Sequence, residues 1–430
     1  MKRSGLRAMR LMLVCSLIVC VAGASLSAQE KTTDWRQFRG PGGQGVSPTK
    51  GLPLTWNQQE NVLWKTALPG AGSSSPIIVG ARVFITCYSG FNVPGKGPGN
   101  MEQLKLHVVC LNRDSGKILW NQEVAPTLPE QAKVRDNHGY ASSTPTSDGE
   151  RVYAFFGKSG VLAFDFEGKQ LWRSGMGSGV SGFGTGASPI LFNDLLIVNA
   201  SVESESLVAL DTRTGKEKWR SKGIREAFNT PALVPVNDGK TELVVGMPGK
   251  VLGFDPATGE QSWSCANEIT WYIVPSVVAY QGVVWSIGGR SGIAAVAVRA
   301  GGRGDVTKTH RLWTSKKGCN VSSPIIHEGR LYWMNDQGIA YCAEAKSGNI
   351  IYEERVDRID QVWASPVLAD GKLFYLSRRG DTIVLPARPK HERLVVNTLR
   401  DGSTFNASPA VAGDRLFLRS DLFLYCVGGK

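Results

Sequence analysis

Two glycine-rich stretches of this 430-residue chain have the spacing of nucleotide-binding loops. Gly177, Gly179 and Gly182 form a G-x-G-x-x-G pattern, and residues 90–96 form a G-x-x-x-x-G-K pattern. Such loops bind phosphate where a helix begins directly after them, because its free backbone N–H groups contact the anion. Here the following residues favour strands, and Gly97 replaces the hydroxyl residue that the second pattern requires. Neither stretch is therefore predicted to bind a nucleotide.

Residues that carry catalysis or bind metals are few and scattered. The chain has no H-E-x-x-H zinc motif and no G-x-S-x-G nucleophile motif. Its histidines are His107, His138, His310, His327 and His391. The cysteines after residue 28 show no C-x-x-C spacing and are Cys87, Cys110, Cys265, Cys319, Cys342 and Cys426. We expect no catalytic residues and no metal site, and we leave a disulfide between the first two cysteines open.

The amino terminus has the pattern of a secretory leader. Basic residues precede an apolar run at residues 11–22, and small residues follow at 24–28. We expect a signal peptide at residues 1–28 and a protein exported to the periplasm or secreted. Its removal lowers the formal net charge from +12 to +8, because this segment holds four basic residues and no acidic one. With no run of like charges and no other apolar stretch of spanning length, we expect no nucleic-acid partner and no transmembrane segment.

A repeat dictates how any binding residues are positioned. A hydroxyl residue followed by proline and an apolar run recurs, with Val274 in its place at the fifth copy and Ser276 after that proline. After a first step of 69 residues, the copies are 42–49 residues apart. The prolines are Pro76, Pro145, Pro189, Pro231, Pro275, Pro324, Pro366 and Pro409.

Each copy contains four short apolar runs separated by turns such as N-D-G and T-G. Four antiparallel strands in about 43 residues are typical of a β-propeller blade. The sequence therefore predicts an all-β, eight-bladed β-propeller. The fourth run usually ends in an aromatic residue that we expect to dock one blade on the next: Trp120, Trp172, Trp219, Trp263, Trp313 and Tyr352.

The two ends of the chain are predicted to close the ring together. Only three strands fit after Pro409, whereas Trp64 lies 12 residues before Pro76, the spacing of a fourth strand. The strand at residues 61–68 should therefore complete the last blade. We predict a signal peptide at 1–28, an amino-terminal extension at 29–60 and the propeller at 61–430.

The turn sequences resemble the pyrroloquinoline-quinone-like (PQQ-like) repeat family. L-D-T-R-T-G-K-E-K-W at 210–219 and F-D-P-A-T-G-E-Q-S-W at 254–263 carry its mark, and the resemblance covers residues 61–430. The family includes quinoprotein alcohol dehydrogenases and the non-enzymatic BamB-like scaffolds, so the resemblance implies a fold rather than an activity. Residues 34–47 resemble the start of exported bacterial members. The fifth and seventh units, at 298–313 and 386–396, lack the clean Asp and T-G.

Variable polar and aromatic residues gather on one predicted face. The connections between blades and the second-to-third-strand loops share that face, whereas the opposite turns are monotonous. The candidate ligand-binding residues are His138, Tyr140, Arg225, Glu226, Asn229, Trp271, Tyr272, Asn320, Gln361, Trp363 and Asn406. A basic rim that would attract anions is predicted from Lys158, Lys250, Arg290, Arg378 and Arg379. Two insertions, Ser89–Gln103 and Asn121–Tyr140, fall on the same face as a lid or a decorated rim.

Two functions compete on this scaffold. The first is a monomeric, non-catalytic binding propeller whose partner is a protein, an anionic small molecule or a glycan. The second, implied by the resemblance, is a dehydrogenase of alcohols or sugars that binds PQQ with calcium. For that function Glu226, Asn229, Asn320, Asp360 and Trp271 are available, but the adjacent-cysteine pair of many alcohol-oxidising members and a haem motif are missing. A glycan-acting hydrolase or lyase ranks third.

Overall fold

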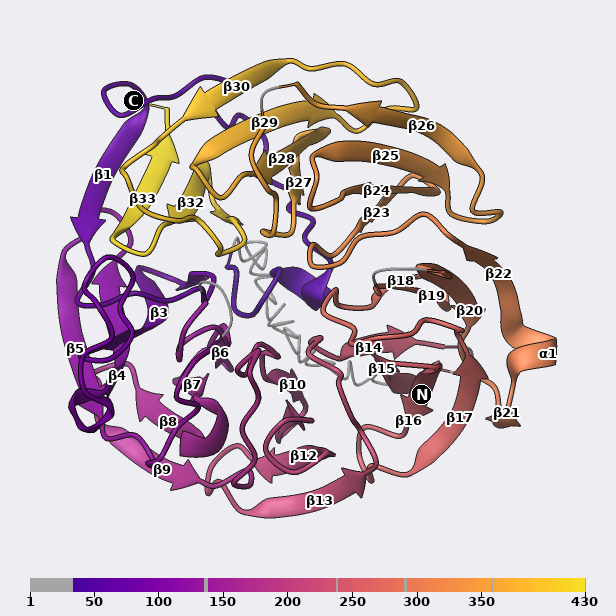
Figure 1. Ribbon diagram of the computed structural model, residues 1–430, viewed down its shortest axis with the longest axis horizontal. Coiled ribbons are helices and arrows are strands. Elements are labelled where there is room, and N and C mark those ends of the chain that lie inside the picture. Colours follow the sequence, from indigo (N-terminus) through magenta and orange to yellow (C-terminus); the bar gives the residue numbers. More distant parts are fainter. Residues whose placement is uncertain (1–33, 135–137, 237–238, 290–291, 358, 430) are drawn as a thin grey trace, which may run out of the picture. The chain divides into compact units, whose positions relative to one another are not determined.

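Four-stranded antiparallel sheets recur along the described chain, as the repeat predicts. The computed structural model describes residues 34–134, 138–236, 239–289, 292–357 and 359–429. The expected signal peptide and Arg290 lie outside these ranges. Within them, eight sheets are arranged as a closed ring around a central channel (Figure 1). The prediction of an eight-bladed β-propeller is confirmed.

Each sheet is one blade, and its strands follow the chain from the channel outward. Blades 1 to 4 contain β2 (Ile77–Val79), β3 (Arg82–Ser89), β4 (Lys105–Asn112) and β5 (Ile118–Val124); β6 (Thr146–Ser147), β7 (Arg151–Phe155), β8 (Val161–Asp165) and β9 (Gln170–Ser174); β10 (Ile190–Phe192), β11 (Leu195–Ala200), β12 (Ser206–Asp211) and β13 (Glu217–Lys222); β14 (Ala232–Pro235), β15 (Thr241–Met247), β16 (Lys250–Phe254) and β17 (Gln261–Ala266).

The second half of the ring repeats this order. Blades 5 to 8 contain β18 (Val278–Tyr280), β19 (Val283–Ile287), β20 (Ala295–Arg299) and β22 (Arg311–Ser315); β23 (Ile325–His327), β24 (Arg330–Met334), β25 (Ile339–Glu344) and β26 (Ile350–Arg355); β27 (Val367–Ala369), β28 (Lys372–Leu376), β29 (Asp381–Pro386) and β30 (Val395–Thr398); β31 (Ala410–Ala412), β32 (Arg415–Arg419), β33 (Phe423–Gly428) and β1 (Val62–Ala67). Short additional elements are η1 (Pro41–Gly43), η2 (Met101–Gln103), η3 (Gly157–Ser159), β21 (Gly304–Asp305) and α1 (Thr307–His310).

The ring closes between its first and last strands. β1 pairs antiparallel with β33, and Trp64 lies opposite Cys426. The amino-terminal strand therefore completes the last blade, as predicted. The inner strands are apolar on both faces because each blade packs against two neighbours; Leu207 and Val208 of β12 are both fully buried. All six cysteines in the described residues are buried and unpaired, which closes the question of a Cys87–Cys110 disulfide.

The tryptophans of the outer strands dock each blade on the next. The Nε1–H of Trp172 in blade 2 donates to the carbonyl of Thr212 in blade 3 at 3.0 Å. Trp64, Trp120, Trp219 and Trp313 make the same contact to a backbone carbonyl of the next blade at 2.9–3.2 Å. The predicted docking role is confirmed at these positions.

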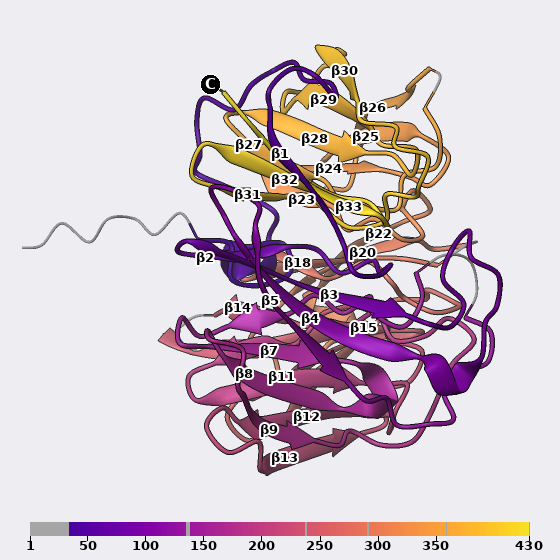
Figure 2. The same ribbon diagram turned by 90° about the vertical axis from the view of Figure 1, so that its left-hand side faces the viewer.

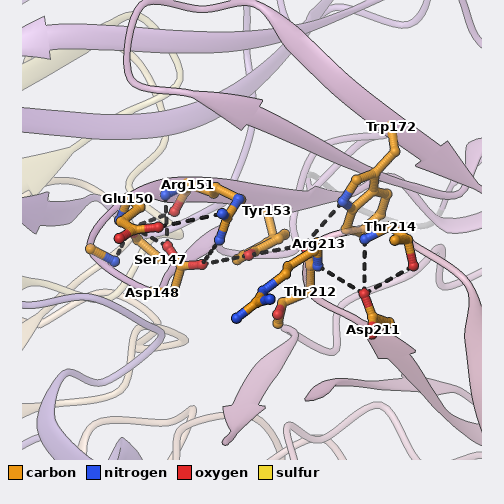
Figure 3. Close-up of polar contacts among 11 residues, drawn as sticks. Ser147, Asp148, Glu150, Arg151, Tyr153, Trp172, Asp211, Thr212, Arg213 and Thr214 are labelled. Carbon is orange, nitrogen blue, oxygen red and sulfur yellow. Dashed lines mark hydrogen bonds and ion pairs between the residues drawn. The ribbon is translucent and has the colours of Figure 1, made fainter. Parts of the chain in front are cut away.

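The Asp and T-G of the repeat shape the turn that receives the tryptophan (Figure 3). The carboxylate of Asp211 accepts from the backbone N–H groups of Arg213 and Thr214 and from the Thr214 hydroxyl at 2.9–3.1 Å. Hydrogen bonding to Thr214 lowers the pKa of this carboxyl to about 2. Gly215 has a φ of 68°, and a Cβ there would lie 2.5 Å from the Trp172 ring. Glycine is therefore required for the close approach of the indole.

A segment of the amino-terminal extension, residues 34–60, crosses the channel; we call it the crossing segment. Its turn η1 lies at the centre of the ring (Figure 1). The backbone of Trp35 pairs with Ile78 in blade 1, and Ser47 N–H donates to Leu368 O in blade 7. The segment also bonds blades 2, 5, 6 and 8, through Ser147, Ala279, Pro324 and Gly413. It therefore ties together blades that are distant in the sequence.

The two faces of the ring differ in their connections. We call the face with the inter-blade connections and the second-to-third-strand loops the loop face, and the opposite one the turn face. In side view the β3–β4 connection with η2 projects on one side, and η1 lies toward the other (Figure 2). In the described part of the chain, no helix has the length and apolar character needed to cross a membrane.

Candidate functional site

A cavity of about 440 Å³ lies in the channel; we call it the central cavity. Most of its lining comes from the connections that lead into the first strand of each blade. Phe38 of the crossing segment also lines it. This geometry places a concave site where the loop-face connections converge, with an aromatic ring of the crossing segment in its wall.

Hydroxyl residues at the start of the inner strands form a belt around the central cavity. The backbone N–H of each belt residue donates to the hydroxyl oxygen of the next blade's belt residue, at 2.9–3.2 Å from Ser75 round to Ser408. Each oxygen along this series is an acceptor, and the described residues provide no acceptor for the belt's own O–H groups. The belt consists of Ser75, Thr144, Ser188, Thr230, Ser276, Ser323, Ser365 and Ser408.

The belt explains the hydroxyl before the repeated proline. In blade 5 the belt position is taken by Ser276, one residue after the proline rather than one before it. Val274 also lines the cavity. The sequence showed the repeated hydroxyl as a mark of the fold, but its role in the cavity wall went unrecognised. The signal was present, since the hydroxyl residue recurs beside every one of the eight prolines.

Aromatic rings form two parts of the cavity wall. Phe183, Phe228 and Tyr272 make one cluster, with ring centroids 4.7–6.0 Å apart. Trp363 lies in the wall as well, and the guanidinium of Arg378 lies 3.9 Å from its ring centroid. Rings of this kind bind apolar or planar groups through large contact areas. Phe183 and Phe228 are not among the ligand-binding residues predicted from the sequence.

The described wall of the central cavity carries no lysine, arginine or carboxylate. His138 is its one titratable imidazole, and its Nδ1 lies 2.6 Å from the Ser142 hydroxyl oxygen. Burial lowers the pKa of His138, which favours the neutral ring at neutral pH. The Oδ1 of Asn320 is buried and has no hydrogen-bond partner in the described part of the chain. The site is therefore neutral and rich in hydrogen-bond donors.

The structure brings five of the predicted connection residues into the cavity wall. They are His138, Tyr272, Asn320, Trp363 and Asn406.

The other six predicted connection residues lie elsewhere. Asn229 is fully buried, and its amide donates to the carbonyls of Gly246 and Ile273, so it holds blades together. Trp271 is 56% exposed, and Tyr140 packs within the insertions. Arg225, Glu226 and Gln361 are exposed at the surface. The order of strands and connections in the sequence predicts that these residues lie on the loop face, but not whether each side chain points into the central cavity.

The predicted basic rim does not line the central cavity. Lys158 donates to the carbonyl of Pro129 in an insertion at 2.7 Å. Arg379 lies 3.7 Å from Asp360, and Lys250 is exposed at the start of β16. Arg378 is the described rim residue that contacts the wall, through Trp363 and through Asn406 Oδ1 at 3.2 Å.

The residues suggested for a calcium-bound quinone are not brought together. Asn229 is engaged with backbone carbonyls, Asp360 faces Arg379, and Glu226 and Trp271 are exposed outside the wall. Calcium sites need carboxylate oxygens, and the described cavity wall supplies none. No group of three or more acidic, histidine or cysteine side chains in the described ranges has metal-binding geometry. The described residues therefore do not fit this cofactor.

The two insertions contact each other beside blades 1 and 2. Asn92 Nδ2 donates to Ala132 O at 2.8 Å and to the Tyr140 hydroxyl at 3.1 Å. The Tyr140 ring packs edge-on against Tyr88. The structure thus joins the insertions, and His138, at the end of the second one, reaches the cavity wall.

A buried carboxyl, Glu203, lies on the loop face near the second insertion. The Thr185 hydroxyl donates to its Oε1, and its Oε2 has no partner among the described residues. Burial raises the pKa of Glu203 to about 7, and Glu130 adds to this. A Cβ on Gly177 or Gly179 would lie about 2.1 Å from carbonyls of the 202–203 turn. The G-x-G-x-x-G pattern therefore permits close backbone packing around this carboxyl, consistent with its rejection as a nucleotide loop.

Comparisons with known proteins agree with this architecture. A family model described as outer membrane protein assembly factor BamB matches residues 104–354. The BamB of Yersinia pestis is 23% identical over 331 residues, which cover 73% of this chain and 77% of that protein.

Solved structures show the same fold. The BamB structure from Moraxella catarrhalis has a TM-score of 0.59 at 12% identity, covering 86% of this chain and 97% of its own. The quinohemoprotein alcohol dehydrogenase of Comamonas testosteroni has a TM-score of 0.62 at 10% identity, covering 93% and 81%. At such identities the likeness concerns the fold alone, and it includes both an assembly factor and an enzyme.

Proposed function

Because this chain belongs to the PQQ-like propeller family described as outer membrane protein assembly factor BamB, we propose that it is an exported, non-catalytic, monomeric propeller that binds a protein partner on its loop face. The proposal includes removal of residues 1–28 as a signal peptide and export to the periplasm. The name of the Yersinia pestis relative supports a partner from outer membrane protein assembly.

The neutral, donor-rich central cavity is the observation that carries this proposal. The hydroxyl belt offers O–H donors, and Phe183, Tyr272 and Trp363 offer apolar surface. A peptide segment combines carbonyl acceptors with apolar side chains, so its chemistry complements both parts of the wall. The described residues of this wall include no carboxylate, which argues against a general acid–base pair or a calcium site among them.

A photo-crosslinking experiment tests the site. Benzoylphenylalanine placed at Phe183 in the cavity wall should form an adduct with one protein in cells that naturally make this propeller. The same group at Leu171, which is exposed on the outer strand β9, is the matched control. We expect the adduct from position 183 and not from 171, and we expect Trp363→Ala to reduce it at least several-fold because it removes apolar contact area.

Two results would contradict the site. Equal adducts from both positions would indicate nonspecific proximity. An adduct at position 183 that Trp363→Ala leaves unchanged would place the partner outside the cavity. Folding of each variant is checked by its thermal unfolding transition.

The dehydrogenase alternative has a separate test. The purified protein is mixed with PQQ and calcium, and dye reduction is followed with alcohols and sugars. We expect no quinone-dependent turnover, because the residues available for calcium lie apart from one another. Saturable turnover that depends on both PQQ and calcium would overturn the non-catalytic proposal.

A further inference from the structure

The fifth repeat unit departs from the others and builds a second cavity. Residues 300–310 leave β20, add the short strand β21 to the outer edge of blade 4, and form α1 before β22 begins. β21 pairs parallel with β17, with Gly304 opposite Trp263. The backbone N–H of Ala266 donates to the Thr307 hydroxyl at 2.9 Å. The insertion is thus anchored on the neighbouring blade and bridges blades 4 and 5.

Below this bridge lies a cavity of about 290 Å³, which we call the blade 4–5 cleft. Its walls come from the first-to-second-strand turns of both blades and from the insertion, so it lies on the turn face, away from the loop-face connections around the central cavity. Lys240, Arg299, Arg303 and His310 line it together with one carboxylate, Glu242.

Glu242 is already engaged by the protein. Its Oε2 accepts from Trp263 Nε1–H at 2.7 Å and from Gly301 N–H at 2.9 Å, and the residue is 6% exposed. In the next blade, the insertion with β21 and α1 replaces the short glycine turn after β20, and Trp263 bonds Glu242 of its own blade instead. Arg303 Nη1 lies 3.6 Å from Glu242 Oε1. One buried carboxylate therefore shares the cleft lining with three cationic side chains, of which Arg303 lies beside it.

The remaining cations of the cleft lack counter-ions. Within the described residues neither Lys240 nor Arg299 has an ion-pair partner, whereas nearby Arg311 bonds Glu268 at 2.5 Å. Among the described lining residues, the positive charges of Lys240, Arg299 and Arg303 exceed the negative charge of Glu242 by two. Like charges that share one cavity repel, and an anion bound between them relieves this repulsion. Such an arrangement is typical of oxyanion recognition.

We propose that the blade 4–5 cleft binds a phosphate-type oxyanion, carried by a small soluble molecule or by a lipid headgroup. The arginines supply forked N–H donors for two oxygens of the group, and Lys240 supplies a third positive charge. The 290 Å³ cleft is larger than one phosphate, so it has room for a second phosphate or an attached sugar. The cleft is separate from the proposed partner site on the loop face, so the anion proposal can be tested independently of the partner proposal.

Inorganic pyrophosphate is the probe, titrated calorimetrically into the full chain after its leader is removed. We expect saturable one-to-one binding that weakens as salt rises. Arg299→Gln combined with Lys240→Gln should weaken it about tenfold or more, because two charged hydrogen-bond donors to the anion are lost. Lys346→Gln is the matched control, since Lys346 is an exposed cation on the turn face of blade 6.

A second variant separates binding from folding. Glu242→Gln keeps an oxygen that can accept from Trp263 and Gly301, but removes the negative charge, so pyrophosphate should bind several-fold more tightly. Absence of saturable binding, an equal loss in Lys346→Gln, or no effect of the double substitution would each overturn the proposal.

The source of the oxyanion is decided with vesicles. The protein is sedimented with phosphatidylglycerol vesicles and, as a control, with phosphatidylcholine vesicles. Binding to the first kind only, lost in the protein that carries both Arg299→Gln and Lys240→Gln, would assign a lipid headgroup. Pyrophosphate binding without vesicle binding would assign a soluble ligand. Both results support the anion site.

Discussion

Single buried ionisable residues make this propeller sensitive to pH. Glu203 has its pKa raised to about 7 by burial, above the value near 4.3 of an exposed glutamate. The folded state therefore holds a proton that the unfolded state loses between these values. The contribution of Glu203 to stability is present below pH 4 and is lost as the pH rises toward 7.

Glu203→Gln tests this effect. The amide keeps an acceptor for the Thr185 hydroxyl without a titrating group, so the variant should gain stability relative to the parent by about 3–4 kcal/mol between pH 4 and pH 8. The measurement is the free energy of unfolding at each pH. Because the comparison is a difference, the burial that raises the pKa of Asp421 to about 6 cancels.

Glu205→Gln in the same loop is the control. Glu205 is exposed and pairs with Arg225, so its substitution should change the free energy of unfolding by less than about 1 kcal/mol at any pH. If the difference in the free energy of unfolding between the parent and the Glu203 variant did not change with pH over this range, the carboxyl would have an ordinary pKa and the prediction would be wrong.

At the scale of strands and turns, the docking of tryptophan into the next blade supplies much of the ring's cohesion. Gly215→Ala adds a Cβ that would lie 2.5 Å from the Trp172 ring at a φ of 68°. Gly249→Ala shares the positive φ but has no atom within 4 Å. We expect the Gly215 variant to lose about 1–3 kcal/mol more stability, measured by denaturant unfolding. Equal losses would show that backbone strain alone accounts for the glycine.

Trp172→Phe separates the hydrogen bond from the packing. The ring remains apolar, but the donor to the Thr212 carbonyl is lost, so we expect a loss of about 1 kcal/mol. Trp172→Ala removes both and should cost about 3–5 kcal/mol. If the two substitutions cost the same, the carbonyl contact would dominate over packing.

The blades and their strands could be predicted from the sequence more completely than the side chains that line the central cavity. The repeated proline marks every blade locally, and the Asp and T-G turns mark several of them, so the blade number and the closing strand at Trp64 follow from spacing alone. Side-chain direction depends on distant contacts. Asn229 is predicted to bind a ligand, but its amide donates to backbone carbonyls of neighbouring chain segments. Ser276 joins the belt although it follows the repeated proline instead of preceding it. Phe38 enters the cavity from a segment without any repeat.

For the whole molecule, the crossing segment should add stability beyond that of the closed ring. It buries Trp35, Leu52 and Trp56 against blades 1, 7 and 8. A chain that begins at Asn61 retains β1 and ring closure but loses these contacts. We expect it to fold with a melting temperature lower by roughly 10 °C or more, since each buried tryptophan contributes several kcal/mol. An unchanged melting temperature would show that the segment only decorates the ring.

The crossing segment and β1 also impose an order on biogenesis. During synthesis residues 46–67 emerge early, yet the chain that pairs with them, from Leu368 to Val427, emerges last. Trp35 can pair early with Ile78 of blade 1, but residues 46–67 must wait for these partners until almost the entire polypeptide is available. Such long-range pairing slows folding and favours contact with chaperones. Under the proposed export, this delay would have a benefit, because a chain that cannot close early stays unfolded and competent for translocation.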